Sequence, residues 1–324
     1  MNRTGWLLLT LATLGVIGSW VGVILGPANL DASAAFSAVF GGGDGPTGII
    51  VREIRLPRVG ATLVAGAGLG AAGAMLQSAM RNPLGDPQIF GIGGGAAIVQ
   101  ALAIAGVVTL GPWGLISLSV VASLGVAAVI TLFAIREGMT PARLALVGIS
   151  VGALSLAITT ALLAASRVVS SQALALVGGS LANRGWDSWI PALTWLFVGT
   201  VIAVVISGRI NLLALGDNVA ANLGAHPRST RAAAMAAAGI LSGATVTIAG
   251  LIGFVGLLAP HMTRWLAGHD TRTLMLVSPP LGAVLTLYSD QVARLAVAPS
   301  ELPVGLVATV LGAPVMIYVA RWVT

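Results

Sequence analysis

Apolar residues dominate this chain in long runs that short polar stretches interrupt. A helix that crosses the hydrocarbon core of a bilayer needs about 20 residues. Runs of that length fall near 5–25, 58–80, 91–110, 114–135, 144–166, 190–207, 232–249, 251–267, 274–297 and 302–320. The pattern predicts an all-α polytopic membrane protein with about ten transmembrane helices in a single domain, residues 1–324. The boundaries between 232 and 267 are the least distinct.

The longest polar interruption in the second half of the chain is residues 209–231, R-I-N-L-L-A-L-G-D-N-V-A-A-N-L-G-A-H-P-R-S-T-R. Leucine and valine recur in it at three- and four-residue spacing, which is typical of short amphipathic helices. Gly216 followed by Asp217 predicts a helix stop and then an N-cap, while Gly224 and Pro227 end the second helix. A folded, half-apolar element between spans is expected to dock on a partner. The alternatives are a lipid-surface helix and a simple connector.

The composition excludes a soluble protein. Hydrophobic residues make up 57% and charged residues 8% of the 324 positions, and the mean hydropathy is +0.99, whereas soluble domains carry about 25% charged residues. The 16 basic residues stand singly at the ends of apolar runs, which argues against nucleic acid as a partner. Arg3 is expected to hold the N-terminus in the cytoplasm, so the first run is a retained span and ten crossings return the C-terminus to that side.

Two residue types are missing altogether. The absence of cysteine excludes disulfides and thiolate metal sites. Every basic residue is arginine, so the P-loop lysine that reaches nucleotide phosphates is missing and the glycine-rich run 91–96 is not a nucleotide site. Another chain must therefore hydrolyse any ATP that drives this protein. His261 and His269 lack the spacing of metal ligands, so no metal site is expected.

Arginines gather at the outer side, against the positive-inside tendency. Arg52, Arg55 and Arg58 recur every three residues at the start of the second span, which places them on one face of a helical turn. Asp290 and Arg294 form an i,i+4 pair near the outer end of the ninth span. Two explanations are open: contact with lipid headgroups or nearby carboxylates, and charge-assisted bonds to a partner protein.

The fifth span carries several small polar side chains. Such residues suggest a translocation path, although they equally often bond their own i−4 carbonyl or pack helices together. The candidates for the path are Ser150, Ser155 and Thr159.

Several short motifs occur in a recognisable order over nearly the whole chain. They are R-L-P-R at 55–58, Q-S-A-M-R-N-P-L-G-D-P at 77–87, F-V-G-L-L-A-P-H-M-T-R at 254–264, G-H-D-T-R at 268–272, D-Q-V-A-R at 290–294, E-L-P-V-G at 301–305 and L-G-A-P at 311–314. In these motifs the sequence resembles the FecCD-type permeases, which are the transmembrane subunits of type II ABC importers for ferric siderophores, haem and cobalamin.

The resemblance implies a ten-span subunit of the bacterial cytoplasmic (inner) membrane, in contact with membrane lipid and paired with a second copy or a paralogous permease. Two ATPase subunits, which hold ATP and Mg, would dock below, and a periplasmic or lipoprotein substrate-binding protein above. No cofactor is expected on this chain itself. The binding protein would meet Arg55, Arg58 and Arg294.

The resemblance also assigns residues 211–224 as coupling helices that enter a cleft of the ATPase. The residues concerned are Leu213, Leu215, Asp217, Val219, Ala220, Ala221, Leu223 and Gly224. Thr140, Pro141 and Ala142 would belong to the inner gate, where Pro141-Ala142 departs from the small hydroxyl residues of some members.

Other functions fit less well. An ion-coupled secondary transporter would need carboxylates at the membrane midplane, whereas the ten acidic residues stand at span ends or in loops. A membrane enzyme would need a convergent set of catalytic groups, and none is found. The segment G-G-S-L-A-N-R-G-W at 178–186 resembles ferric-siderophore members of the family more than cobalamin members. The resemblance therefore implies a ferric siderophore as the substrate, with haem and cobalamin as the alternatives.

Overall fold

The computed structural model describes residues 3–26, 30–42, 45–134, 141–166 and 170–320, and over these ranges every regular element is a helix. In chain order the helices are α1 Arg3–Ile24, α2 Ala32–Val39, α3 Pro46–Ile49, the π-helical η1 Ile50–Arg55, α4 Leu56–Met80, α5 Gly94–Ile104, α6 Pro112–Ala134, α7 Pro141–Ala165, α8 Ser170–Gly178, α9 Trp186–Leu213, α10 Asp217–Asn222, α11 Pro227–Ala249, α12 Val255–Ala267, α13 Thr271–Leu295 and α14 Val304–Ala320. The all-α fold class predicted from the sequence is confirmed.

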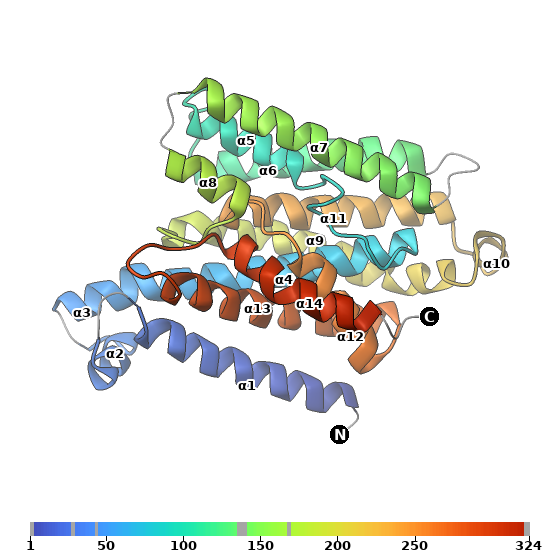
Figure 1. Ribbon diagram of the computed structural model, residues 1–324. Helices are drawn as coiled ribbons and strands as arrows, with labels where there is room; N and C mark the ends of the chain where they lie inside the picture. The colour runs from blue at the N-terminus through green and yellow to red at the C-terminus, as the bar shows by residue number, and fades with distance from the viewer. Residues whose placement is uncertain (1–2, 27–29, 43–44, 135–140, 167–169, 321–324) are drawn as a thin grey trace.

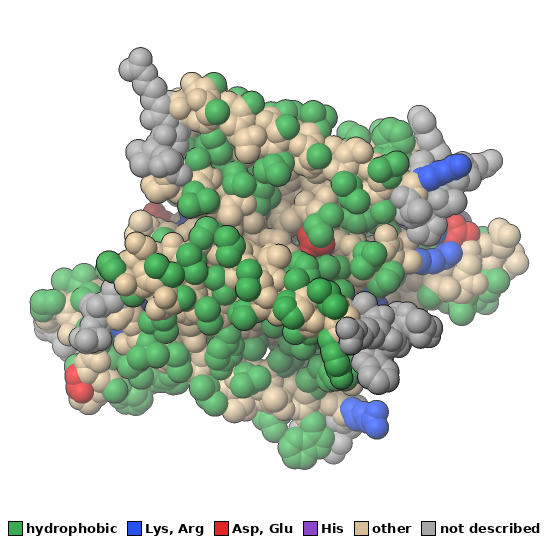
Figure 2. Space-filling view, viewed as in Figure 1, with side chains coloured by type: hydrophobic (Ala, Val, Ile, Leu, Met, Phe, Trp, Pro, Cys, Tyr) green, Lys and Arg blue, Asp and Glu red, His purple; other side chains and the backbone are tan. Residues whose placement is uncertain are grey.

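The long helices lie side by side as one bundle (Figure 1). Helices α2, α3 and α8 lie at one end of the bundle, called here the outer end, and α10 lies at the other, the inner end. Helix α1 begins and α14 finishes at the inner end, as the expected topology requires. Figure 2 shows a largely apolar surface between the two ends, which suits a surface in contact with lipid.

Each predicted span contains a helix, but the helices differ in length. Six stretches are long and apolar enough to cross a membrane: α1, Pro46–Met80, α6, most of α7, α9 and α11. Helix α13 has 25 residues and a more polar composition, while α5, α12 and α14 have 11, 13 and 17 residues. The expected spans 91–110 and 251–267 are therefore too long, because irregular backbone occupies part of each run.

The second predicted span, α4, is the centre of the bundle and packs against α9, α11, α12 and α13. Glycines allow this close approach. A Cβ atom on Gly70 would lie 2.2 Å from the Ser278 carbonyl oxygen, and one on Gly73 would lie 1.8 Å from that of Gly256. Small residues let membrane helices approach until their backbones touch. Van der Waals packing then holds the helices together, because the hydrophobic effect does not drive helix association inside a lipid bilayer. The alanine- and glycine-rich sequence of α4 thus sets the spacing of its neighbours.

The segment between α4 and α5 folds back into the protein. Within this segment Asp86, Phe90 and Ile92 are each 0–2% exposed. The Asp86 carboxylate accepts hydrogen bonds from the N–H groups of Gln88 and Ile89 at 2.8 and 3.0 Å, and it lies at the N-terminus of α12. The carboxylate thereby satisfies backbone donors that the irregular segment leaves without helical partners.

Candidate functional site

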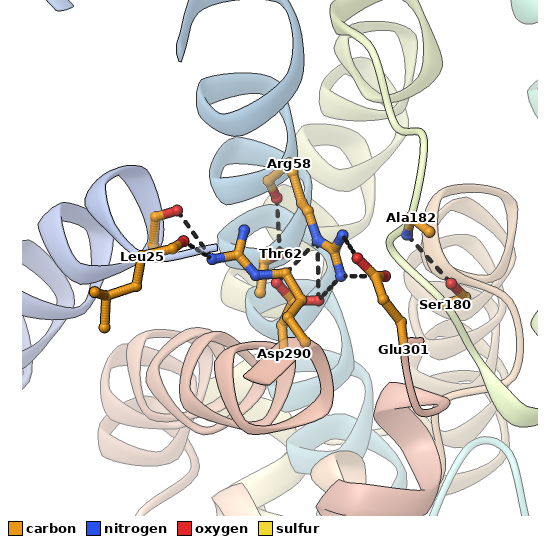
Figure 3. A network of polar contacts seen from close by, with 9 residues as sticks. Leu25, Arg58, Thr62, Ser180, Ala182, Asp290 and Glu301 are labelled. Carbon is orange, nitrogen blue, oxygen red and sulfur yellow. Dashed lines mark hydrogen bonds and ion pairs between the residues drawn. The ribbon is translucent and has the colours of Figure 1, made fainter. Parts of the chain in front are cut away.

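Arg58 lies at the outer end of α4 and joins three parts of the chain. Its guanidinium donates to the Asp290 carboxylate of α13, with an Nη2–Oδ1 distance of 2.8 Å, and to both Glu301 oxygens at 2.8 and 2.9 Å (Figure 3). Arg58 is 7% and Asp290 3% exposed. Planar, paired contacts of this kind suit a guanidinium between two carboxylates. They lock α4 to α13 and to the segment that precedes α14.

Arg55 and Arg294 close the outer end of α1. Arg55 donates to the carbonyl oxygens of Val23 and Ile24 at 2.7 and 2.6 Å. Arg294 donates to those of Gly22 and Leu25 at 3.1 and 2.6 Å. The last carbonyls of a helix lack intrahelical donors and carry partial negative charge, so they act here in place of carboxylates.

The expectation that Arg52, Arg55 and Arg58 share one face of a helical turn is wrong, because Arg55 contacts α1 and Arg58 contacts α13. Arg55 and Arg294 are each 4% exposed, whereas Arg52 is half-buried. Asp290 pairs with Arg58 across two helices and not with Arg294 along its own helix. One cause is the π-helical winding of η1, which brings residues five apart into register and so disperses a three-residue repeat.

The side chains of segment 211–224 fall into two sets, one buried in the protein and one exposed at its surface, called here the inward and the outward set. Leu213 and Ala220 are fully buried and pack with Ala225. The outward set is Leu215, Val219 and Leu223, which are 60%, 46% and 56% exposed, together with Ala221 and Gly224. Leu213 was expected on the docking surface, and that expectation is wrong because this residue belongs to the last turn of α9. The first of the two short helices expected here is the end of α9, and the second is α10.

Two arginines fix α10 to the bundle through Asp217. Its carboxylate oxygens accept hydrogen bonds from the Arg231 guanidinium of α11 at 2.7 and 2.8 Å. They also accept one at 2.5 Å from the guanidinium of Arg81, which follows α4. These hydrogen bonds, that of Arg231 foremost, hold the pKa of Asp217 below its ordinary value. The N-cap is Gly216, with a φ of 107° that favours glycine, and not Asp217 as expected.

A basic cavity of about 590 Å³ lies beside this element at the inner end. Its charged walls are Arg81 and Arg264, and His261, His269 and Trp265 complete that side. Arg264 donates to the Gln77 side chain, while the buried Nδ1 of His261 has no hydrogen-bond partner among the described residues. No group of three potential metal-ligating side chains occurs in the part of the chain that the structure describes.

The candidate path residues of α7 face different surroundings. Ser150 is exposed, but Ser155 and Thr159 are 5% and 0% exposed. Ser155 packs closely on α5: a Cβ atom added to Gly94 would lie 2.3 Å from the Cβ of Ser155. The Thr159 hydroxyl donates a hydrogen bond of 2.8 Å to the Ser155 carbonyl oxygen. Helix packing and i−4 bonding thus account for both buried side chains.

The inner-gate residues expected from the sequence are described only in part. Thr140 lies outside the described residues. Pro141 and Ala142 begin α7, and the structure describes their backbone but not their side chains.

A second polar cavity, of about 500 Å³, opens at the outer end between α5, α8 and the segment before α14. Arg184 lines it, together with Asn183, Gln100 and Gln172. Arg184 was not among the predicted site residues. The signal that could have identified it is an arginine inside the outer polar segment 178–186, away from any span end.

The profile of the FecCD transport family matches residues 12–322. The chain belongs to the FecCD transport family. It is similar to the iron(3+)-hydroxamate import system permease protein FhuB of Bacillus subtilis, with 36% identity over 94% of this chain and 80% of the relative. It is also similar to the ferric enterobactin transport system permease protein FepD of Escherichia coli, with 33% identity over 96% and 93% of the two chains.

Members of the FecCD family with other substrates match as well. The vitamin B12 import system permease protein BtuC of Vibrio cholerae is 36% identical over 83% of this chain and 82% of its own. Among solved structures, a metal-chelate type ABC transporter in an inward-facing conformation superposes with a TM-score of 0.79 at 29% identity, and it covers 97% of this chain and 98% of its own. The architecture expected from the sequence, that of a type II ABC importer permease, is confirmed, and the chain is a multi-pass permease subunit of an importer.

Proposed function

We propose that this FecCD permease forms the translocation path for an iron chelate in the bacterial cytoplasmic membrane. Among iron chelates, a ferric siderophore is the favoured substrate. Two partner ATPases bind ATP and Mg and hydrolyse ATP, a binding protein delivers the chelate, and a second permease copy or a paralogue completes the path. The observation that carries this proposal is the outward apolar set on α10 and the residues that flank it, an element that Asp217 fixes to Arg81 at the end of α4 and to Arg231 of α11.

The geometry of α10 suits the transmission of force. Leu215, Val219 and Leu223 present apolar surface at the inner end, where it costs free energy unless a partner covers it. The ion pairs of Asp217 tie the same element to Arg81 and Arg231. A partner that moves α10 therefore pulls directly on α4, the central helix, and on α11.

The positive electrostatic potential of the outer end favours docking of the binding protein. The cluster holds three arginines and two carboxylates: Asp290 and Glu301 both pair with Arg58, while Arg55 and Arg294 donate to carbonyls at the end of α1. The carbonyls of α1 offset the remaining positive charge only in part. The three arginines then attract acidic groups of a binding protein from beneath the surface, an effect on encounter rate and orientation more than on affinity.

Iron chelates are the first choice of substrate because FhuB and FepD act in ferric import systems. The similarity to BtuC keeps cobalamin as the alternative, and haem stays a further one. The polar cavity of about 500 Å³ at the outer end has a size that admits part of such a ligand.

Reconstitution tests the proposed function. The permease, its ATPase and its binding protein are placed in proteoliposomes, and uptake of radioactive iron is followed with and without ATP. We expect uptake only with ATP and all three components, and less uptake of cyanocobalamin than of a ferric siderophore. Uptake driven by a proton or sodium gradient without the ATPase would instead establish a secondary transporter.

A further inference from the structure

The outer cavity holds an arginine without an internal counter-charge. Arg184 lies in the loop between α8 and α9, and its Nε is buried with no hydrogen-bond acceptor. Glu301 lines the same cavity, but both of its oxygens accept from Arg58. Asp187 is exposed, and no carboxylate lies within 4 Å of Arg184 among the described residues. A guanidinium remains charged at neutral pH, so its positive charge faces the cavity uncompensated.

The loop that carries Arg184 is held firmly. The Ser180 N–H donates to the Ala249 carbonyl of α11 at 2.9 Å, and the Val304 N–H of α14 donates to the Gly179 carbonyl at 2.9 Å. The Ser180 hydroxyl accepts from the Ala182 N–H at 3.2 Å, as Figure 3 shows. Leu181 is fully buried. Arg184 is therefore presented from a fixed backbone, which lowers the entropic cost of binding a ligand.

Burial without a partner has an energetic consequence. Loss of hydration lowers the pKa of the Arg184 guanidinium. A partly desolvated cation that the fold leaves unpaired costs stability, and an anion that enters the cavity removes this cost. A ligand that brings a negative group thus gains more here than at an exposed arginine.

We propose that this outer-end cavity binds the anionic group of an oxygen-rich organic chelate, with Arg184 as its charge partner. The inference rests on the proposed function and names the substrate group and the side chain that meet. The volume of about 500 Å³ exceeds what an inorganic anion fills, and it falls within the range of organic-ligand sites.

The rest of the wall fits the same ligand class. The amides of Gln172 and Asn183 supply donors for ligand oxygens, while Leu174 and Leu302 supply apolar contact. The amide of Gln100 is oriented by a 3.1 Å hydrogen bond to the Ser119 hydroxyl. One cation, several neutral donors and apolar surface together recognise a carboxylate-bearing chelate better than a bare ion.

Equilibrium binding to the permease–ATPase complex in nanodiscs, without nucleotide or binding protein, tests this inference. The probes are Fe(III)–citrate, which is anionic, and ferrichrome, which is uncharged. The variants are Arg184→Gln, which removes the charge, and Arg184→Lys, which keeps it. Arg52→Gln is the matched control, because Arg52 lies at the same end but does not line the cavity.

We expect Arg184→Gln to weaken Fe(III)–citrate binding by about tenfold or more, since charged hydrogen bonds contribute that much. Arg184→Lys should weaken it less, and ferrichrome binding should change less than about twofold on the same scale. A melting temperature no lower than that of the wild type confirms the fold, because loss of an unpaired cation should not destabilise the protein. Equal loss for both chelates, an effect no larger than that of Arg52→Gln, or no binding of Fe(III)–citrate by the wild type would overturn the inference. None of these outcomes decides the proposed function, which is tested separately by ATP-driven uptake in proteoliposomes.

Discussion

At the scale of single residues, the outer arginines show how a membrane protein accommodates buried charge. Arg58 has two carboxylates, and Arg55 and Arg294 have the carbonyl end of α1. A buried ion pair is poor evidence of net stabilisation, because desolvation offsets most of the attraction. Removal of one partner is a different matter, since it leaves the other charge buried and unpaired.

Arg58→Gln should therefore lower stability strongly. With Asp290 left 3% exposed and uncompensated, the loss is expected to reach about 3–5 kcal/mol. Thermal unfolding of the purified permease in detergent measures it, with Arg52→Gln as the control. A double variant with Asp290→Asn should recover part of the loss. If the double variant is no more stable than Arg58→Gln, the pairing does not account for the burial.

The pH dependence of α10 follows from Asp217. Its pKa is lowered from 3.8 in the folded protein, first by Arg231, so the ion pairs contribute stability above that value and lose it as pH falls through the lower, folded pKa. The protection factors of the amides of residues 217–222 should thus stay high at pH 5 and fall only below pH 3.8. Asp217→Asn should show low protection factors at both pH values. Equal protection in the variant and the wild type would mean that packing alone holds α10.

At the scale of the elements, most of the fold is visible in the hydrophobic pattern. The runs 58–80 and 232–249 match α4 and α11 closely, because both are continuous and buried. The fold-back at 81–93 escaped prediction, because its apolar residues continue into α5 without a break in the pattern. The burial of Arg55 and Arg294 escaped it too, since the α1 carbonyls that receive them are backbone groups, which every residue carries.

Helix α10 offers the sharpest test of coupling. Leu215→Asp or Leu223→Asp should abolish transport while the protein still inserts and assembles, because a carboxylate against an apolar partner surface costs several kcal/mol. Uptake and ATP hydrolysis are measured on the same proteoliposomes. Val107→Asp, at an outer loop position that is 70% exposed, is the matched control. Normal transport by both leucine variants would leave α10 as a connector only.

Backbone contact around α4 gives a second prediction for an element. Gly73→Ala places a methyl group against the Gly256 carbonyl, and overpacking of this kind costs about 1–3 kcal/mol or more. Gly125→Ala in α6 is the control, since no atom lies within 4 Å of a Cβ there. Melting temperatures in detergent should fall for the first variant only. A similar fall for both would mean that the contact with the Gly256 carbonyl is not the cause, because helix propensity favours alanine over glycine at both positions.

At the scale of the whole molecule, one helix connects the two candidate surfaces of the permease. The arginine cluster at the outer end and α10 at the inner end are joined by α4, which carries Arg58 in its first turn and ends beside Arg81. The candidate site was predictable in its location at both ends but not in its detail. Partners that lie more than 200 positions apart, such as Arg58 and Asp290, leave no local trace in the sequence.

The purified permease should hydrolyse no ATP in lipid, because no lysine is available to form a P-loop. Phosphate release is expected only after the ATPase is added. The control is the same preparation with an ATPase whose own P-loop lysine is replaced. Turnover by the permease alone, above that of a mock purification, would contradict the prediction.

The arginine cluster also imposes an order on how the chain is made. Arg55 finds its acceptors only 31 and 32 positions back, as soon as α4 enters the membrane. Arg58 waits for carboxylates 232 and 243 positions ahead, and the α1 carbonyls wait 269 and 272 positions for Arg294. Until α13 is inserted, the outer end of the nascent chain therefore holds an unneutralised cation and an unfinished helix terminus. Insertion of that late helix brings Asp290 to Arg58 and Arg294 to the α1 carbonyls, so a chain truncated before residue 290 is expected to have a less stable outer end than the finished subunit.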